Sequence, residues 1–471
     1  MNIAVIGAAR SGLAAALLAK KLLHNVFLSE SRSKDDFQET FDLLQKNGIE
    51  SEFGGNTNKA LEGTELIITS PGVPRTAWII KEAEKLNIPV ISELEFAYQH
   101  CKNPIIAITG TNGKTTTTSL IAHIFNKSER KAVVAGNIGE PLSNIILRQA
   151  QEDGRQKSED RSQNEKQQDD IKDSLIDKNT VLVVEVSSYQ LDRIVNFKPE
   201  VALILNITPD HLAYHGTIED YARTKYKIAK NHDSNCLLIL NADDELASKG
   251  ALYTQGQVAY FSINKVVGGI YSRDGKMCYN YPKQQKEEII MTLDEVSIPG
   301  THNAQNSMAA ALAARAFEIT NENIRDSLMT FEGVEHRLEF VRNIDGVDYI
   351  NDSKATNINA TWYALSSYKK PIIWIAGGRG DSNNYSELDD VAEKNVDTVI
   401  AIGEESNNIF NHFSSKLRCF RCDSLEAAVI KARNIALKGN IVLFTPACKS
   451  FDMFINYEHR GEVFKEIVNK L

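Results

Sequence analysis

Residues 105–125 read IIAITGTNGKTTTTSLIAHIF, and the order of residue types in this stretch decides the fold class of the surrounding chain. The apolar run at its start predicts a buried strand. Residues 110–113 predict a glycine turn, and the residues from Lys114 onward predict a helix. Backbone N–H groups at such a helix start point outward, and the helix dipole favours an anion there. The stretch therefore predicts an α/β domain with an anion-binding loop.

The Gly113-Lys114-Thr115 triplet indicates that the anion bound by this loop is a nucleoside triphosphate. A lysine at this position reaches the β- and γ-phosphates, and the threonine hydroxyl can bind Mg²⁺. The spacing departs from the common phosphate loop, because Ile108 stands where a glycine is usual and Gly110 lies closer. A plain strand-to-helix turn is the alternative, which the triplet disfavours. The predicted contacts are Gly110, Thr111, Asn112, Gly113, Lys114, Thr115 and Thr116.

Polar residues follow two further predicted strands. Glu185 closes the apolar run in VVEVSSYQL, and Asp210, His211 and His215 follow the next run in ILNITPDHLAYHG. Taken alone, Glu185 would be a surface acid at a strand end and His211 a loop histidine. Their joint position downstream of a phosphate loop indicates Mg²⁺ coordination and control of phosphoryl transfer.

The N-terminal strand, Ile3–Ile6, leads into GAARSG and an Ala/Leu-rich helix. Gly7 and Gly12 have the outer spacing of a dinucleotide fingerprint, and Glu30 ends the next strand where a ribose-binding acid is expected. Ala9 replaces the middle glycine, and its methyl group would impede a pyrophosphate. Binding of some nucleotide is favoured over NAD binding, with a purely structural turn as the third possibility.

Strands alternate with helices along the whole chain, which predicts three consecutive α/β units. The predicted domains are 1–93, 94–299 and 300–471, the last beginning at Pro299-Gly300. Residues 151–179 are dense in Lys, Glu, Asp, Gln and Ser and few are apolar, so most of this stretch is expected to be a solvated insertion.

Composition excludes several classes of protein. The chain has 471 residues, 42% hydrophobic and 24% charged, with a net charge of −9, which argues against a nucleic-acid or anionic-membrane partner. No apolar run predicts a membrane span, and the N-terminus does not resemble a secretory signal. Six cysteines are too few for a disulfide scaffold, so a cytoplasmic location is expected, and Cys419 and Cys422 lack the second CxxC pair of a zinc ribbon.

The chain resembles the Mur ligases of bacterial cell-wall synthesis over nearly its whole length, apart from residues 151–179. The resemblance is carried, in family order, by GTNGKTT, EVSSYQL, NITPDHLAYHG, GTHNAQNSMAA, EHRLE, NDSKATN and TPACKSFDMFINYEHRGEVF. It implies three domains: an N-terminal Rossmann-like UDP-substrate domain, a central ATPase-like phosphate-loop domain and a C-terminal Rossmann-like ligase domain. It also implies a role in peptidoglycan synthesis, and thereby in cell shape and division.

The implied activity is ATP-dependent addition of D-glutamate to UDP-N-acetylmuramoyl-L-alanine. In this family ATP phosphorylates the substrate carboxylate, an amino group attacks the acyl phosphate, and phosphate leaves. By the resemblance, Lys114 holds phosphate oxygens, Thr115 and Glu185 bind one Mg²⁺, and Glu185, His211 and Lys225 serve a second. A lysine ammonium would repel Mg²⁺, but the match of YARTKYKIA places Lys225 at the family lysine that CO₂ carbamylates; Lys227 is the neighbouring alternative.

The resemblance also assigns the substrate contacts. Positions matching UDP-substrate contacts are Arg10, Ser11, Glu30, Ser31, Arg32, Ser70, Pro71, Gly72 and Asn137. Further ATP contacts match Asn303, Asn306, Arg337 and Asp352, and D-glutamate contacts match Lys354, Thr356, Ser450 and Tyr457. One departure concerns the turn GGRGDSNNY: Asp381 stands where the family often has a lysine for the amino acid. Either Arg379 supplies that positive charge or another residue does.

The expected partners are these small molecules, and the protein is expected to act as a monomer. Three alternatives stay open: another amide ligase of the family, MurC first among them, a regulatory phosphate-loop ATPase, and a Rossmann dehydrogenase. The segments HNAQN and NDSKATN argue against a simple ATPase switch, which needs no second nucleotide-contacting domain. Ala9 and the Lys114 loop argue against the dehydrogenase.

Overall fold

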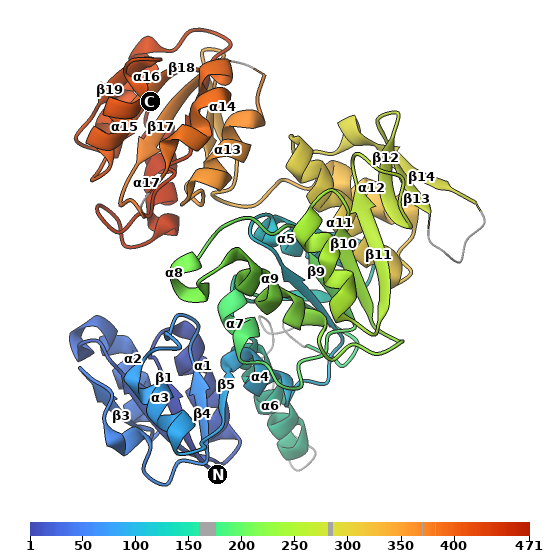
Figure 1. Cartoon of the computed structure of the whole chain (residues 1–471), viewed down its shortest axis with the longest axis vertical. Helices are drawn as coiled ribbons and strands as arrows, with labels where there is room; N and C mark the ends of the chain where they lie inside the picture. The colour runs from blue at the N-terminus through green and yellow to red at the C-terminus, as the bar shows by residue number, and fades with distance from the viewer. Residues whose placement is uncertain (160–175, 281–285, 370, 382) are drawn as a thin grey trace. The chain divides into compact units, whose positions relative to one another are not determined.

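Three β-sheets with helices packed against them form the described part of the protein (Figure 1). The computed structural model describes residues 1–159, 176–280, 286–369, 371–381 and 383–471. These residues divide into two compact units, Met1–Leu293 with Asn306–Leu328, and Asp294–Gln305 with Met329–Leu471. The expected α/β class with three sheets is confirmed. No helix of the described residues is long and apolar enough to cross a membrane.

The N-terminal sheet is entirely parallel, with the order β3-β2-β1-β4-β5. Its strands are β1 (Asn2–Ile6), β2 (Asn25–Glu30), β3 (Glu50–Phe53), β4 (Leu66–Thr69) and β5 (Val90–Ser92). Its helices are α1 (Arg10–Lys21), α2 (Gln38–Lys46), α3 (Trp78–Lys85) and α4 (Glu93–Tyr98). The strand order reverses beside β1, so the loops after β1 and β4 border the crevice where ligands of such sheets bind.

The central sheet has nine strands in the order β14-β13-β12-β11-β10-β9-β6-β8-β7. The strands are β6 (Ile105–Thr109), β7 (Ala132–Gly136), β8 (Val181–Glu185), β9 (Val201–Ile204), β10 (Leu237–Asn241), β11 (Gln257–Ser262), β12 (Gly269–Arg273), β13 (Lys276–Asn280) and β14 (Glu288–Thr292). Strands β6, β8, β9 and β10 are buried at every residue, as expected for parallel strands covered on both faces. The antiparallel pairing of β12, β13 and β14 was not expected from the sequence.

The helices between β6 and residue 330 are mostly short. They are α5 (Lys114–Lys127), α6 (Leu142–Glu159), α7 (Ser188–Asp192), α8 (Leu212–His215), α9 (Ile218–Tyr226), α10 (Glu245–Ser248), α11 (Thr301–Ala316) and α12 (Asn321–Thr330).

The C-terminal sheet has the order β15-β16-β20-β17-β18-β19, parallel except for the β15–β16 pair. Its elements are β15 (Glu339–Ile344), β16 (Val347–Asn351), α13 (Ile358–Ser366), β17 (Ile372–Gly377), α14 (Asp389–Asn395), β18 (Val396–Ile402), α15 (Ser406–Phe413), β19 (Arg418–Arg421), α16 (Leu425–Ile435), β20 (Ile441–Phe444) and α17 (Tyr457–Asn469). Ile372 and Trp374 pack in one core, and Ile373 and Ile375 in the other, because alternate strand residues face opposite ways. Cys419 and Cys422 likewise pack against different cores, so the CxxC pair does not converge on a metal site.

The structure describes both ends of residues 151–179, most of which were expected to form a solvated insertion. Helix α6 continues to Glu159, and the described chain resumes at Ile176, which packs against the core of its unit. Asp177 is anchored as well: its carbonyl oxygen accepts a hydrogen bond from Asn103 (2.7 Å), and its carboxylate accepts from the backbone N–H of Thr180 (2.9 Å). The remaining residues, 160–175, lie outside the described part of the chain.

Candidate active site

The loop between β6 and α5 has the geometry of an anion-binding turn. Gly113 adopts a left-handed conformation (φ +83°), and a Cβ there would lie 2.4 Å from the Oδ1 atom of Asn306. Only glycine fits, because both the backbone angle and the neighbouring amide exclude a side chain. The Lys114 ammonium donates hydrogen bonds to the carbonyl oxygens of Gly110 (2.9 Å) and Thr111 (2.8 Å), so it lies over the loop at the start of α5.

Asn206 fixes the shape of this loop, although it is not among the site residues predicted from the sequence. Its Oδ1 atom accepts from the N–H of Asn112 (2.8 Å), and its Nδ2 atom donates to the Asn112 carbonyl (3.0 Å). Its backbone carbonyl accepts from the N–H of Thr111 (2.9 Å). The position of Asn206 just after a buried strand was the available signal, since polar groups gather where parallel strands end.

Glu185 lies at the end of β8, next to the phosphate loop. Its carboxylate is 2% exposed and accepts hydrogen bonds from the Thr115 hydroxyl (2.9 Å) and the Asn137 amide (2.8 Å). These hydrogen-bond partners are neutral, so a buried carboxylate lies beside a hydroxyl, and both are hard oxygen donors. This donor set fits Mg²⁺. It also brings Asn137, assigned to the UDP substrate, against the predicted metal ligand.

Lys225, on α9, is 1% exposed and points at the same loop. Its Nζ atom donates to the Gly110 carbonyl (2.8 Å) and lies 4.5 Å from the centre of the Tyr221 ring. Burial lowers the pKa of Lys225 well below its ordinary value, and the nearby Lys114 acts in the same direction. Burial and the neighbouring Lys114 charge therefore both favour the unprotonated amine of Lys225.

Lys227 has a different environment. Its ammonium donates to the carbonyl oxygen (2.8 Å) and the carboxylate (3.2 Å) of Asp192. Asp192 also binds the Arg75 guanidinium and accepts from the Tyr214 hydroxyl (3.2 Å). Lys227 is thus a charged member of an ion-pair network, and Lys225 is the lysine that faces the phosphate loop.

The two histidines of the NITPDHLAYHG motif differ in character. His211 has a left-handed backbone (φ 54°), is exposed, and lies 3.6 Å from the Asp210 carboxylate. His215 is buried, contacts the Ser188 hydroxyl (3.0 Å) and packs among Tyr189, Tyr214 and Tyr221. Burial lowers the pKa of His215 to about 4, so it is neutral and structural, whereas the His211 ring is accessible to a ligand.

The N-terminal candidates gather at the carboxyl edge of their sheet. A Cβ at Gly12 would lie 1.8 Å from the Gly7 carbonyl oxygen, so this glycine lets α1 start against the turn. The Glu30 carboxylate accepts from the N–H groups of Ala8 (2.7 Å) and Arg32 (2.9 Å), which joins two loops. Of the other UDP-substrate candidates in this domain, Arg10 and Ser11 begin α1, Ser31 follows β2, and Ser70, Pro71 and Gly72 follow β4.

The second unit holds the remaining ATP candidates around Asp352. This side chain is buried and accepts from the N–H of Leu338 (3.2 Å) and the Thr445 hydroxyl (2.9 Å). Burial raises the pKa of Asp352 to about 6, against the opposing effect of Arg337. The Nε atom of Arg337 is buried without a hydrogen-bond partner among the described residues. Asn303 donates to the Pro299 carbonyl (2.7 Å) in this unit.

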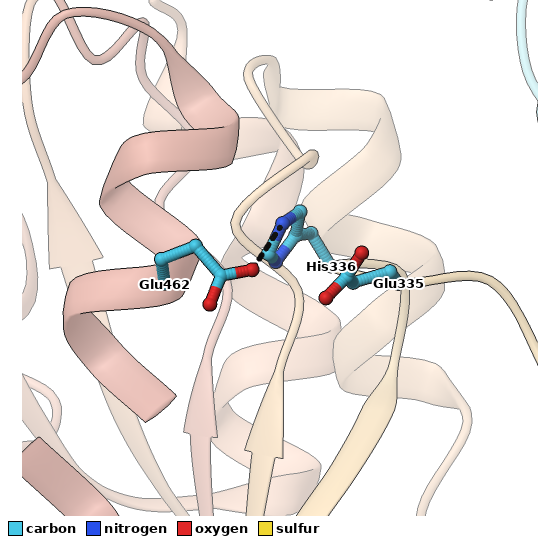
Figure 2. A group of neighbouring side chains, drawn as sticks. All are labelled: Glu335, His336 and Glu462. Atoms are coloured by element: carbon cyan, nitrogen blue, oxygen red, sulfur yellow. Dashed lines mark ion pairs between the residues drawn. The ribbon is translucent and has the colours of Figure 1, made fainter. Parts of the chain in front are cut away.

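Glu335, His336 and Glu462 form a cluster of possible metal ligands (Figure 2). The Lys465 ammonium binds Glu335 and lies 3.0 Å from Glu462. The Nδ1 atom of His336 accepts from the Asn351 amide (2.9 Å). The lysine supplies the positive charge that the carboxylates need, so this cluster is an ion-pair network that positions the loop before β15.

The D-glutamate candidates follow strands β16 and β20 of the C-terminal sheet. The Lys354 ammonium lies 5.2 Å from the centre of the Tyr457 ring, and the backbone carbonyl of Tyr457 accepts from the Ser353 hydroxyl (2.8 Å). Ser450 is buried after β20, and Thr356 follows β16. Thus the structure brings Lys354 and Tyr457 together within one unit.

Comparison with known proteins identifies the family that this arrangement matches. Residues 108–314 match the Mur ligase middle domain, and residues 336–448 match the Mur ligase glutamate ligase domain. The UDP-N-acetylmuramoylalanine–D-glutamate ligase of Salinibacter ruber is 40% identical, over 99% of this chain and 97% of the relative. The enzyme of the same name from Koribacter versatilis is 38% identical, over 100% and 97%.

Solved structures share the fold at lower sequence identity. The UDP-N-acetylmuramate–alanine ligase of Thermotoga maritima superposes with a TM-score of 0.57 at 18% identity, covering 100% of this chain and 99% of that one. A pseudomurein peptide ligase from Methanothermus fervidus gives the same TM-score, identity and coverage.

Proposed function

The chain belongs to the Mur ligase family, and from this membership we propose that it joins D-glutamate to UDP-N-acetylmuramoyl-L-alanine with ATP as the energy source. The observation that carries the proposal is the match, over 99–100% of the chain, to relatives of that one activity. The reaction serves peptidoglycan precursor synthesis. The γ-phosphoryl group passes to the alanyl carboxylate, the amine of D-glutamate attacks the acyl phosphate, and phosphate leaves.

The phosphate loop holds the triphosphate of ATP in this proposal. The N–H groups at the start of α5 face the phosphates, and Lys114 exchanges its loop carbonyl partners for phosphate oxygens. Because three anionic groups must meet, fixed positive charge at this loop lowers the barrier to phosphoryl transfer. The side chain of Asn306 borders the same loop and contributes to the ATP site.

Thr115 and Glu185 would hold one Mg²⁺, and Glu185, His211 and a carbamylated Lys225 a second. Bound there, Mg²⁺ would neutralise the charge that develops on the transferring phosphoryl group. The lowered pKa of Lys225 supports the carbamate, because it favours the unprotonated nitrogen, which can form a bond to CO₂ and then lose a proton. The product is an anionic oxygen ligand in place of a cation. Lys227, which binds Asp192 as an ammonium, is unsuited to this reaction.

The substrate contacts divide among three domains. We infer that residues 1–93 bind the UDP-sugar, at the crevice bordered by the loops after β1 and β4. Residues 94–299 bind ATP, and residues 300–471 bind D-glutamate through Lys354, Thr356, Ser450 and Tyr457, with Asn303, Arg337 and Asp352 serving ATP. The protein acts as a monomer in the cytoplasm.

Phosphate release tests this function. Purified protein receives ATP, Mg²⁺ and UDP-N-acetylmuramoyl-L-alanine, and only the amino acid is varied. Turnover should depend on D-glutamate. Equal turnover with L-glutamate or L-alanine would refute the substrate assignment while leaving family membership intact, and phosphate release without any amino acid would indicate a regulatory ATPase.

A further inference from the structure

The loops after β17 and β20 are joined at the carboxyl edge of the C-terminal sheet. The N–H of Arg379 donates to the carbonyl of Lys449, and the N–H of Lys449 donates to the carbonyl of Arg379, both at 2.9 Å. A Cβ at Gly378 would lie 2.3 Å from the Lys449 carbonyl oxygen, so the two backbones are in contact. The side chains that project from this bridge are therefore held at a fixed separation.

Two arginines at this edge already contact protein groups. Arg379 makes a two-point contact with Glu404, Nε to Oε2 at 3.0 Å and Nη2 to Oε1 at 2.8 Å. Arg460 is fully buried and donates to the Ser353 hydroxyl (3.0 Å), the Ser353 carbonyl (2.7 Å) and the Cys448 carbonyl (3.0 Å). Arg460 is buried within protein contacts, and the two-point face of Arg379, which best fits a carboxylate, is already filled by Glu404.

Lys449 makes a single-point ion pair, unlike the two-point contact of Arg379 and the buried contacts of Arg460. Its Nζ atom lies 2.8 Å from the Asp381 carboxylate, and the two side chains are 44% and 69% exposed. An ion pair this exposed contributes little to stability, so its ammonium can turn toward another anion at small cost. An ammonium has three N–H donors, which lets Lys449 keep Asp381 and bind a second carboxylate.

We propose that Lys449 binds a carboxylate of the incoming D-glutamate, with Asp381 as the residue that positions it. The inference rests on the proposed function, because that function makes a dicarboxylate the substrate of this domain. Strands β16 and β20 are adjacent and parallel, and Lys354 follows one and Lys449 the other. The ammonium groups of Lys354 and Lys449 thus follow the ends of two neighbouring strands. They match the two carboxylates of D-glutamate in number and are opposite in charge.

The test is steady-state kinetics of Lys449→Met in the full-length chain. The KM for D-glutamate should rise about 10- to 100-fold, because a charge-assisted hydrogen bond is lost. The KM values for ATP and for the UDP-sugar, and the melting temperature, should stay at wild-type values. Lys449→Arg should recover part of the loss. The matched control is Arg379→Gln, which should leave all three KM values unchanged.

Asp381→Asn tests the positioning role, since it keeps the shape and removes the charge. It should change the KM for D-glutamate with kcat unaltered, and it should have no further effect in a Lys449→Met background. The inference would be overturned if Lys449→Met kept the wild-type KM for D-glutamate, or if Arg379→Gln raised that KM more than Lys449→Met does. In either case, D-glutamate-dependent turnover of the wild type would still uphold the proposed function. A wild type that does not use D-glutamate would overturn both.

Discussion

Replacing Lys225 with alanine should nearly abolish amide-bond formation. The side chain is 1% exposed, and its Nζ atom lies 2.8 Å from the Gly110 carbonyl, so a carbamate formed there would act in a water-poor site beside the phosphate loop. A unit anion about 4 Å from a unit positive charge contributes roughly 4 kcal/mol at an effective dielectric constant of about 20. Removal of the carbamate should therefore lower kcat about 10²- to 10³-fold.

The assay separates the lost ligand from a general defect. Alanine leaves space for a small anion, so acetate or formate should partly restore phosphate release by Lys225→Ala. The same anions should not rescue Lys114→Ala, which has lost a cation. Removal of CO₂ and bicarbonate should weaken the wild type, because carbamylation is reversible.

Lys227→Ala is the matched control for this prediction. Its lysine lies two residues away but binds Asp192, so its loss should not create a response to acetate or CO₂. A fully active Lys225→Ala together with a wild type insensitive to CO₂ would refute the reasoning. If Lys227→Ala were the inactive variant that acetate rescues, the assignment would be wrong by two residues.

Three further outcomes are expected. Lys114→Ala should lose turnover by about 10²- to 10³-fold yet bind the UDP-sugar as the wild type does; loss of that binding in calorimetry without ATP, in a folded variant, would contradict the domain assignment. Burial raises the pKa of Asp352 to about 6 from its ordinary value of 3.8, so protonation of this acid stabilises the folded state. The stabilising effect of the protonated acid is present below about pH 4 and is lost as the pH rises through 6. The melting temperature of Asp352→Asn should therefore rise relative to that of the wild type between pH 5 and 7. A difference in melting temperature that does not depend on pH would contradict this. Deletion of residues 160–175 should change neither melting temperature nor activity appreciably, since the segment is almost devoid of apolar residues and loop length enters closure entropy only logarithmically; a large loss of either would show that it packs against the protein.

Much of the fold followed from local patterns. Continuous apolar runs predicted the buried parallel strands, and Ile3–Ile6 was predicted with its observed C-terminal end because a glycine turn follows it directly. The antiparallel edge formed by β12, β13 and β14 was missed, since short half-buried strands carry a weaker periodic signal. The extent of α6 was missed because its charged last turns have the composition of a solvated loop.

The candidate site shows the same division between local and long-range information. The phosphate loop could be predicted because glycine conformation, lysine charge and helix start are all local properties. Burial of Lys225 could not be predicted, since its neighbour Gly110 is distant in sequence and only the sheet order brings them together. Likewise, the pairing of Lys449 with Asp381 depends on a backbone bridge between two loops that no sequence pattern indicates.

The place of β6 in the central sheet has a consequence for synthesis of the chain on the ribosome. Ile105 pairs with Leu182 on one side, and Ile106 pairs with Val201 on the other, so both neighbours of β6 are made roughly 75 to 95 residues later. At about 5–20 residues per second, the apolar strand IIAIT waits roughly 4–20 seconds for its partners. Residues 151–179, rich in charge, are translated within that interval and lengthen it. The strand that carries the phosphate loop is thus also the segment of this sheet longest exposed to chaperones and to aggregation in the nascent chain.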